Sequence, residues 1–157
     1  IQMREAVIVS TARTPIGRAY RGAFNNTPSP TLAGHAIEHA VKRAGIEGAE
    51  VDDVIIGAAM QQGVQATNVA RNSLLRAGLP VSVSGMSLDR QCASGLMAIA
   101  TAAKQIMVDN MTIAIGGGVE SISMVQTPEM RVGADPELVE MHPDIYMPML
   151  QTAEVVA

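Results

Sequence analysis

The sequence predicts an α/β fold built on a mostly parallel sheet. Short runs rich in β-branched residues alternate along the 157-residue chain with longer runs whose apolar residues recur at helical spacing. Strands that are joined through helices run parallel and use right-handed crossovers. The composition agrees, because 48% hydrophobic but only 2% aromatic residues make an aliphatic core, which suits helices packed closely on a sheet. The length is enough for one domain with a hydrophobic core.

Four strands are expected, each short enough for a buried strand of a parallel sheet. The first, at 5–10 (EAVIVS), is expected to be buried on both faces. The others are expected at 51–58, 84–88 and 111–115, and the last is followed by Gly116–Gly118.

Two helices have clear boundary residues. Ser29 and Pro30 open the first helix, with Ser29 as the N-cap and proline at the first helical position, and Gly45 ends it. Asn68 can cap a second helix that runs to Gly78. These two helices are expected to connect the first three strands.

A third helix, from Ala93 to about Asp109, follows the only cysteine of the chain, Cys92. A helix that is apolar nearly all round belongs inside a protein, so this helix, which carries only two charges, is predicted to be buried. At a helix N-terminus, unpaired N–H groups and the helix dipole stabilise a thiolate, and the N–H groups can receive an oxyanion. A lone cysteine is more often a small hydrophobic residue than a nucleophile, so position alone leaves both roles open.

Charge and composition exclude several classes of function. The net charge of −4 argues against nucleic acid as a partner, and no apolar run is long enough to cross a bilayer. One cysteine cannot form an internal disulfide, which predicts a reducing compartment, the cytoplasm or an organellar matrix. His35 and His39 lie four residues apart on the first helix, but no third ligand lies near them in the sequence, so no metal site is expected.

The glycine run Gly116–Gly118 follows a strand, as phosphate-binding loops do. It has neither the lysine of a phosphate loop nor the glycine spacing of a dinucleotide site. We therefore expect these glycines to allow close packing against the residues around Cys92.

The stretch around Cys92, DRQCASGL at 89–96, resembles the nucleophile motif of the thiolases. Three further stretches agree with that family in order and spacing, namely REAVIVSTARTPIG at 4–17, GGGVESIS at 116–123 and QTAE at 151–154. The resemblance covers essentially the whole chain. It identifies Cys92 as the nucleophile, with its backbone N–H in the oxyanion hole.

The resemblance also implies an architecture. The chain is expected to be a thiolase-like βαβαβαββ half, with a mostly parallel mixed sheet and a buried nucleophile helix. Residues 3–122, from Met3 as the natural first residue, form the N-terminal α/β domain, and 123–157 begin a loop domain that covers the site. Because Thr152–Ala157 looks like a first helical turn and then stops, we expect a fragment that lacks the C-terminal half.

The chemistry implied is that of an acyltransferase. A thiolase cleaves a 3-ketoacyl-CoA to acetyl-CoA and a shortened acyl-CoA, or condenses two acetyl-CoA molecules, here through an acyl-Cys92 intermediate. Coenzyme A is a substrate, and no metal or tightly bound cofactor is expected. The expected partners are acyl-CoA and CoA in a homodimer or homotetramer, without nucleic acid or membrane.

Other site residues follow from the resemblance only in part. Met149 matches a family methionine that lines the acyl and pantetheine pocket. The family's histidine, asparagine and second cysteine belong to its C-terminal half, and the chain's three histidines, His35, His39 and His142, lie in no matching motif. Asp89 and Leu150 depart from the asparagine and glycine that are usual there, which leaves the chain-length preference open.

Two alternatives remain at this point. A ketoacyl synthase-type condensing enzyme shares the fold, although the stretches at 11–15 and 151–154 favour a thiolase. The isolated chain, which lacks the family's base and acid, is expected to be inactive and would then act as a non-catalytic assembly module.

Overall fold

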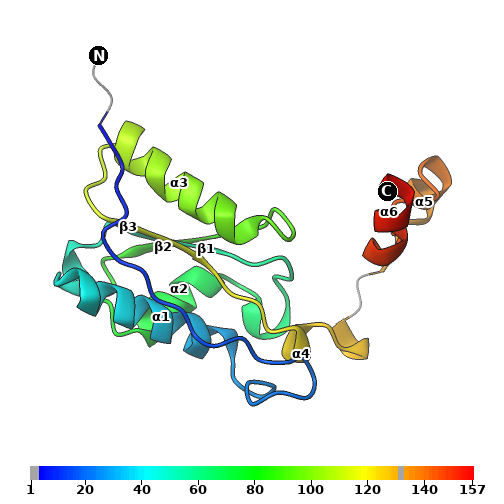
Figure 1. Cartoon of the computed structure of the whole chain (residues 1–157), viewed down its shortest axis with the longest axis horizontal. Helices are drawn as coiled ribbons and strands as arrows, with labels where there is room; N and C mark the ends of the chain where they lie inside the picture. The colour runs from blue at the N-terminus through cyan, green and yellow to red at the C-terminus, as the bar shows by residue number, and fades with distance from the viewer. Residues whose placement is uncertain (1–3, 131–132) are drawn as a thin grey trace.

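The computed structural model describes residues 4–130 and 133–157, so the expected start at Met3 lies outside the described residues. Its centre is a three-stranded sheet in the order β2-β1-β3, with all strands parallel (Figure 1). The strands are β1 (Asp53–Gly57), β2 (Ser84–Leu88) and β3 (Ala114–Gly118). The predicted α/β class with a parallel sheet is confirmed.

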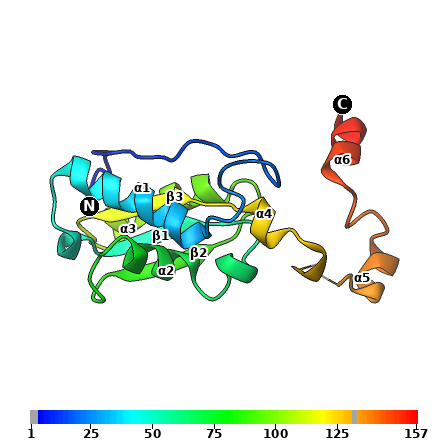
Figure 2. The same ribbon diagram turned by 90° about the horizontal axis from the view of Figure 1, so that it is seen from below.

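Three helices cover the two faces of the sheet, as Figures 1 and 2 show. Helices α1 (Ser29–Ala44) and α2 (Val69–Arg76) lie on one face, and α3 (Ser94–Val108) lies on the other. The central strand is buried along its whole length and alternates between two clusters. Val54 and Ile56 pack with residues of α1 and α2, whereas Ile55 packs with Ala98 and Ala102 of α3. The core therefore forms two layers that share β1.

The remaining elements are short. They are the 3-10 turns η1 (Gly48–Glu50), η2 (Gly63–Gln65) and η3 (Pro128–Met130), and the helices α4 (Ile122–Val125), α5 (Pro136–Met141) and α6 (Met149–Val156). Helices α5 and α6 stand away from the sheet in both views (Figures 1 and 2). Within the part of the chain that the structure describes, no helix is long and apolar enough to cross a membrane.

Two of the predicted capping residues, Asn68 and Gly45, are confirmed, whereas α2 ends at Arg76, before the predicted Gly78. The Asn68 side chain accepts a hydrogen bond from the Arg71 N–H, and Gly45 ends α1 in the left-handed conformation. The predicted cap at Ser29 is wrong, because α1 already begins there and its N-cap is Pro28. The Ser29 hydroxyl instead donates to the side-chain oxygen of Gln65, 2.7 Å away. Gln65 is buried, and a buried polar group needs a hydrogen-bond partner.

The first predicted strand, at 5–10, does not form in the described chain. Its backbone is extended but unpaired, and Val7, Ile8 and Val9 are exposed rather than buried. The segment is held by α1, because the Ser10 hydroxyl donates to the Ala40 carbonyl and Arg43 donates to the Thr11 carbonyl. A β-branched run becomes a strand only where a neighbouring strand supplies partners for its N–H and C=O groups.

The last strand forms later than predicted, at Ala114–Gly118 in place of 111–115, so the glycines belong to it. The carboxylate of Asp52 accepts hydrogen bonds from the N–H groups of Thr112 and Ile113, which removes them from the sheet ladder. Gly116 suits a strand under a close helix, since a Cβ there would lie 2.7 Å from the Cα of Ile99. The predicted packing against the residues around Cys92 is confirmed for Gly118, which meets Gly95, whereas Gly116 packs further along α3.

Two features differ from the expected arrangement at the nucleophile helix and at the chain end. Helix α3 buries only one face, and the side chains of Leu96, Ile99 and Val108 are exposed. No other segment of the described chain fully covers these apolar side chains. One side of a helix that was predicted to be buried is therefore exposed. Helix α6 begins at Met149 after Pro148, so Thr152 lies inside a helix and does not cap one.

Candidate active site

The candidate site lies at the carboxyl end of β2, where the chain turns into α3. We call residues Asp89–Ala93 the nucleophile turn. Its thiol, Cys92, is free and exposed, and α3 begins two residues later at Ser94. The thiol therefore stands at the N-terminus of a fifteen-residue helix, as the sequence predicted.

Hydrogen bonds hold the nucleophile turn in one conformation. The Asp89 carboxylate accepts from the Gln91 N–H at 2.6 Å. The buried Ser94 hydroxyl accepts from the Arg90 N–H at 2.8 Å and donates to the Gln91 carbonyl at 2.6 Å. Gln91 has a φ of 48°, which costs energy for a residue with a Cβ and often occurs where a fold positions a functional group. The turn thus presents Cys92 in a defined place.

Glycines on the neighbouring strands let the sheet approach this turn. A Cβ at Gly57 would lie 2.2 Å from the Ser94 carbonyl carbon and oxygen, and one at Gly118 would lie 3.0 Å from the Gly95 Cα. A Cβ at Gly57 would overlap the Ser94 backbone, and one at Gly118 would be tightly crowded by Gly95. The carboxyl ends of β1 and β3 therefore pack directly against the start of α3. We call Gly57 and Gly118 the glycine floor.

The electrostatics of the site come from the nucleophile turn and from the N-terminal end of α3. Asp89 and Arg90, which have opposite signs, both precede the thiol on its own turn. The α3 N-terminus receives no side-chain cap, because its N-cap residue is Ala93. The N–H groups of Ala93 and Ser94 donate to the carbonyls of Arg90 and Gln91, so an anion here would have to be bound by the other N–H groups at this helix end. In the hydrogen bonds of the described residues, the Cys92 N–H has no acceptor.

A buried polar network lies beside the floor, and sequence reasoning missed it. The side chain of Gln65 is 1% exposed and accepts from the Ser29 hydroxyl at 2.7 Å and the Ser121 N–H at 2.6 Å. It donates to the Met60 carbonyl at 2.8 Å and to Glu120 Oε1 at 2.5 Å. The only sequence signal was the position of Glu120, two residues after the last strand.

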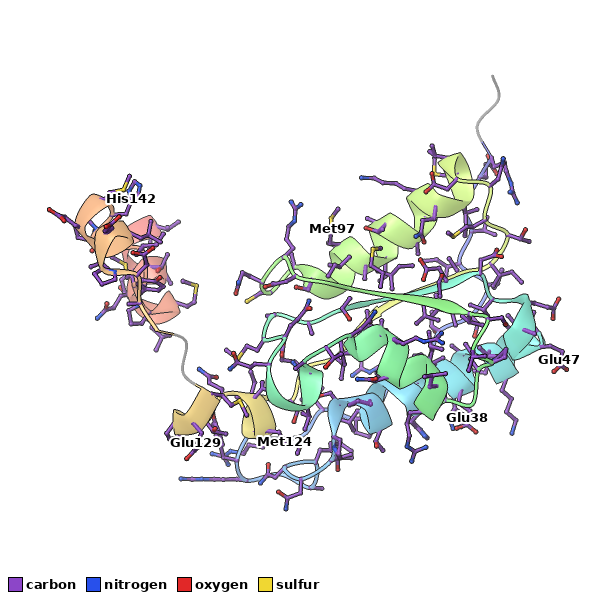
Figure 3. The ribbon with its side chains drawn as sticks, turned by 180° about the vertical axis from the view of Figure 1, so that it is seen from behind. Glu38, Glu47, Met97, Met124, Glu129 and His142 are labelled. Carbon is purple, nitrogen blue, oxygen red and sulfur yellow. The ribbon has the colours of Figure 1, made fainter. Side chains whose placement is uncertain are left out.

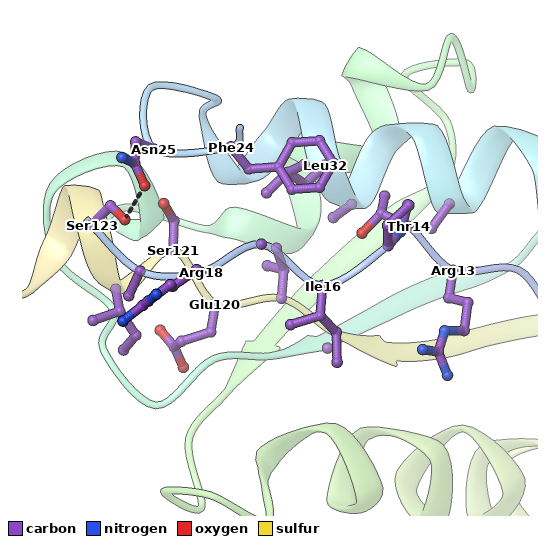
Figure 4. A pocket seen from close by; sticks show the side chains of 18 of the residues that line it. Arg13, Thr14, Ile16, Arg18, Phe24, Asn25, Leu32, Glu120, Ser121 and Ser123 are labelled. Atoms are coloured by element: carbon purple, nitrogen blue, oxygen red, sulfur yellow. Dashed lines mark hydrogen bonds between the residues drawn. The ribbon is translucent and has the colours of Figure 1, made fainter. Parts of the chain in front are cut away.

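A cavity of about 490 Å³ lies between the segment 12–19, α1 and the residues after β3. Figure 4 shows Phe24 and Leu32 on its α1 side and Arg18 near Glu120, with the hydrogen bond from Ser123 to Asn25 at the same end. Its wall includes Gly118, which also contacts the start of α3. The cavity is therefore adjacent to the floor of the nucleophile turn.

The other residues singled out by sequence are not brought to Cys92. His35 and His39 are neighbours on α1, with ring centroids 4.3 Å apart and ring planes tilted by 54°. The described residues contain no group of three or more His, Cys, Asp or Glu side chains that could hold a metal. His142 follows α5 and lies far from α3, on which Met97 is labelled (Figure 3). Met149 is 69% exposed at the start of α6, so its pocket role stays a prediction.

Comparisons with known proteins agree on one family. The family model described as Thiolase, N-terminal domain, matches residues 6–152. The 3-ketoacyl-CoA thiolase of Bacillus subtilis is 42% identical over 155 residues, which are 99% of this chain and 40% of that protein. The beta-ketoadipyl-CoA thiolase of Pseudomonas aeruginosa is 45% identical over 121 residues, 76% of this chain and 30% of that protein.

The structural comparison points the same way. The crystal structure of the Bacillus anthracis acetyl-CoA acetyltransferase superposes with a TM-score of 0.73 at 37% identity, over 85% of this chain and 35% of that one. The chain spans about 40% of the length of its Bacillus subtilis relative. With the fold, the glycine floor and the sequence matches in agreement, this chain belongs to the thiolase family and carries its N-terminal domain.

Proposed function

We propose that this chain supplies the nucleophile of a thiolase-type acyltransferase, with Cys92 as the residue that carries the acyl group. The observation that supports this most directly is the exposed thiol, held at the N-terminus of α3 by a hydrogen-bonded turn. The relatives are named 3-ketoacyl-CoA thiolase and acetyl-CoA acetyltransferase, which fits the same class of reaction.

In the proposed cleavage, the Cys92 thiolate attacks the 3-keto carbon of a 3-ketoacyl-CoA and a C–S bond forms. The tetrahedral oxyanion is stabilised by N–H groups at the start of α3, including that of Cys92. As the carbonyl reforms, the bond between C2 and C3 breaks, and its electron pair goes to C2 of the leaving acetyl-CoA, which takes up a proton. A second CoA thiolate then attacks the acyl-Cys92 thioester and releases the shortened acyl-CoA and the Cys92 thiolate.

The proton transfers need groups that this chain does not bring to the site. His35 and His39 lie on α1, across the sheet from α3, and His142 follows α5, so we assign these three residues no role. The proposal is therefore that the base and the acid come from a part of the complete protein outside these 157 residues. Residues 3–122 are proposed as the N-terminal α/β domain, and 123–157 as the start of a covering loop domain in which Met149 lines the acyl pocket.

The substrates proposed for the complete protein are acyl-CoA and CoA, acting without a metal or a tightly bound cofactor. A homodimer or homotetramer is the proposed assembly.

The test is selective labelling of Cys92 in the complete protein. We expect iodoacetamide to alkylate Cys92 faster than it alkylates glutathione at neutral pH, because the α3 N-terminus stabilises the thiolate. Prior incubation with acetyl-CoA should protect the thiol and leave an acetyl group on the Cys92 peptide, whereas the same concentration of ATP should not protect it. The C92S variant should lose thiolysis. Labelling no faster than glutathione without protection, or full activity in C92S, would contradict the proposal.

A further inference from the structure

We propose that the carboxylate of Glu120 and the amide of Gln65 act as a clamp that positions Cys92 through the loop after β1. We call these two side chains the Glu120–Gln65 clamp, and we call Ala58–Met60 the β1 loop. The inference rests on the proposed function of Cys92 and adds two positioning residues to it.

The clamp ties the β1 loop to the segment after β3. Glu120 Oε2 accepts from the Ala59 N–H at 2.8 Å, and its other oxygen accepts from the Gln65 amide. The same amide nitrogen donates to the Met60 carbonyl. The clamp therefore bonds two residues of the β1 loop, Ala59 through the carboxylate and Met60 through the amide.

The other side of the same loop supports the nucleophile turn. The Ala58 N–H donates to the carbonyl of Leu88, the last residue of β2 before the turn, at 3.1 Å. Gly57, which precedes the loop, leaves no room for even a Cβ against Ser94. The Gly57 carbonyl accepts from the Val119 N–H at 3.1 Å, which adds a direct link to the residue before Glu120. A shift of the β1 loop must therefore move the backbone next to Cys92.

The chemistry of the clamp requires a carboxylate at position 120. Both of its oxygens face N–H donors, one from Ala59 and one from Gln65. An amide in its place can accept only one of these bonds and turns its own NH₂ group toward the other donor. Gln65 uses its full capacity of two donated and two accepted bonds in a buried place, so it cannot rotate to compensate.

The two residues of the clamp differ in how far they are exposed to solvent. Gln65 is buried, whereas Glu120 is exposed and lines the cavity beside the floor. A substitution that keeps the size of Glu120 therefore leaves the hydrophobic core untouched. This makes position 120 the better place to test positioning without unfolding the domain.

The experiment compares E120Q with E129Q in the complete protein. Glu129 is fully exposed and lies on η3, so its substitution makes the same chemical change at a carboxylate outside the clamp. Thiolysis kinetics, the rate of Cys92 alkylation and the thermal unfolding midpoint are measured for both. We expect E120Q to lower kcat by about ten- to a hundredfold, the usual effect of losing a charge-assisted hydrogen bond that aligns a reacting group.

The expected pattern separates positioning from folding. E120Q should keep KM within about twofold and stay fully folded at the assay temperature, with an unfolding midpoint below that of E129Q by no more than the loss of one hydrogen bond at Gln65 causes. Cys92 alkylation should slow along with kcat. Equal kcat in E120Q and E129Q would overturn the inference, as would a loss of activity that only follows a loss of folded protein. Activity retained in C92S would instead refute the proposed function, so the two failures are distinguishable.

Discussion

Gly57 is the position at which the sheet and the nucleophile helix come closest, and G57A measures how tightly they are joined. A Cβ there would lie 2.2 Å from two backbone atoms of Ser94 and 2.7 Å from the Gly95 N–H nitrogen. Backbone atoms cannot change rotamer to relieve such an overlap. Overpacking of a core costs about 1–3 kcal/mol where side chains can adjust, so we expect G57A to cost at least about 3 kcal/mol. That is a large part of a typical domain stability of about 5–15 kcal/mol.

The matched control is G117A on the neighbouring strand. Its Cβ would meet only the end of the Ile56 side chain at 3.7 Å, an ordinary contact. Alanine loses less conformational freedom than glycine on folding, so G117A should be neutral or stabilising by up to about 1 kcal/mol.

The assay is denaturant unfolding together with iodoacetamide labelling of Cys92. We expect G57A to lower the unfolding midpoint and, in whatever protein remains folded, to slow labelling, because relief of the overlap must displace the start of α3. An unfolding midpoint and a labelling rate equal to those of G117A would refute the close approach on which this reasoning depends.

Two further predictions concern single hydrogen bonds. S94A removes a buried hydroxyl that bonds two backbone groups of the nucleophile turn, so it should cost about 1–3 kcal/mol in denaturant unfolding and slow Cys92 labelling. Unchanged labelling would show that the turn holds its shape without that hydroxyl. The pKa of the Glu129 carboxyl lies below its ordinary value, chiefly because of a hydrogen bond from the Thr127 side chain, so T127V should raise it in a carboxyl NMR titration. The stabilisation linked to this group is present above its unfolded-state pKa and is lost as the pH falls through its folded pKa. A titration curve in T127V identical to that of the parent protein would contradict that cause.

Local patterns predicted much of the fold because their partners lie nearby in the chain. β2 forms over the predicted 84–88, and α1 ends at Gly45 in the predicted left-handed cap. β2 has a local strand pattern but also needs β1 as its pairing partner, whereas the end of α1 depends on the αL preference of glycine, a property of one position. Cys92 was placed at a helix N-terminus for the same reason.

Features that depend on distant partners were predicted poorly. The run at 5–10 has strand-like residues but no neighbouring strand in the described chain, so it stays extended and exposed. The outer face of α3 is apolar but uncovered, because burial depends on what packs against a helix and not on the helix alone.

The sequence by itself determined the class of fold, the capping residues Gly45 and Asn68, and the place of Cys92 just before a helix, because strand and helix periodicity, capping and the motif around Cys92 are properties of short segments. Only the tertiary structure showed that Gly57 and Gly118 pack against Ser94 and Gly95 at the start of α3. It also showed that Gln65 and Glu120, 55 residues apart, share one hydrogen bond. The physical reason is that these contacts join segments that are far apart in the sequence and come together only in the folded chain. A pattern within a short segment therefore does not predict them.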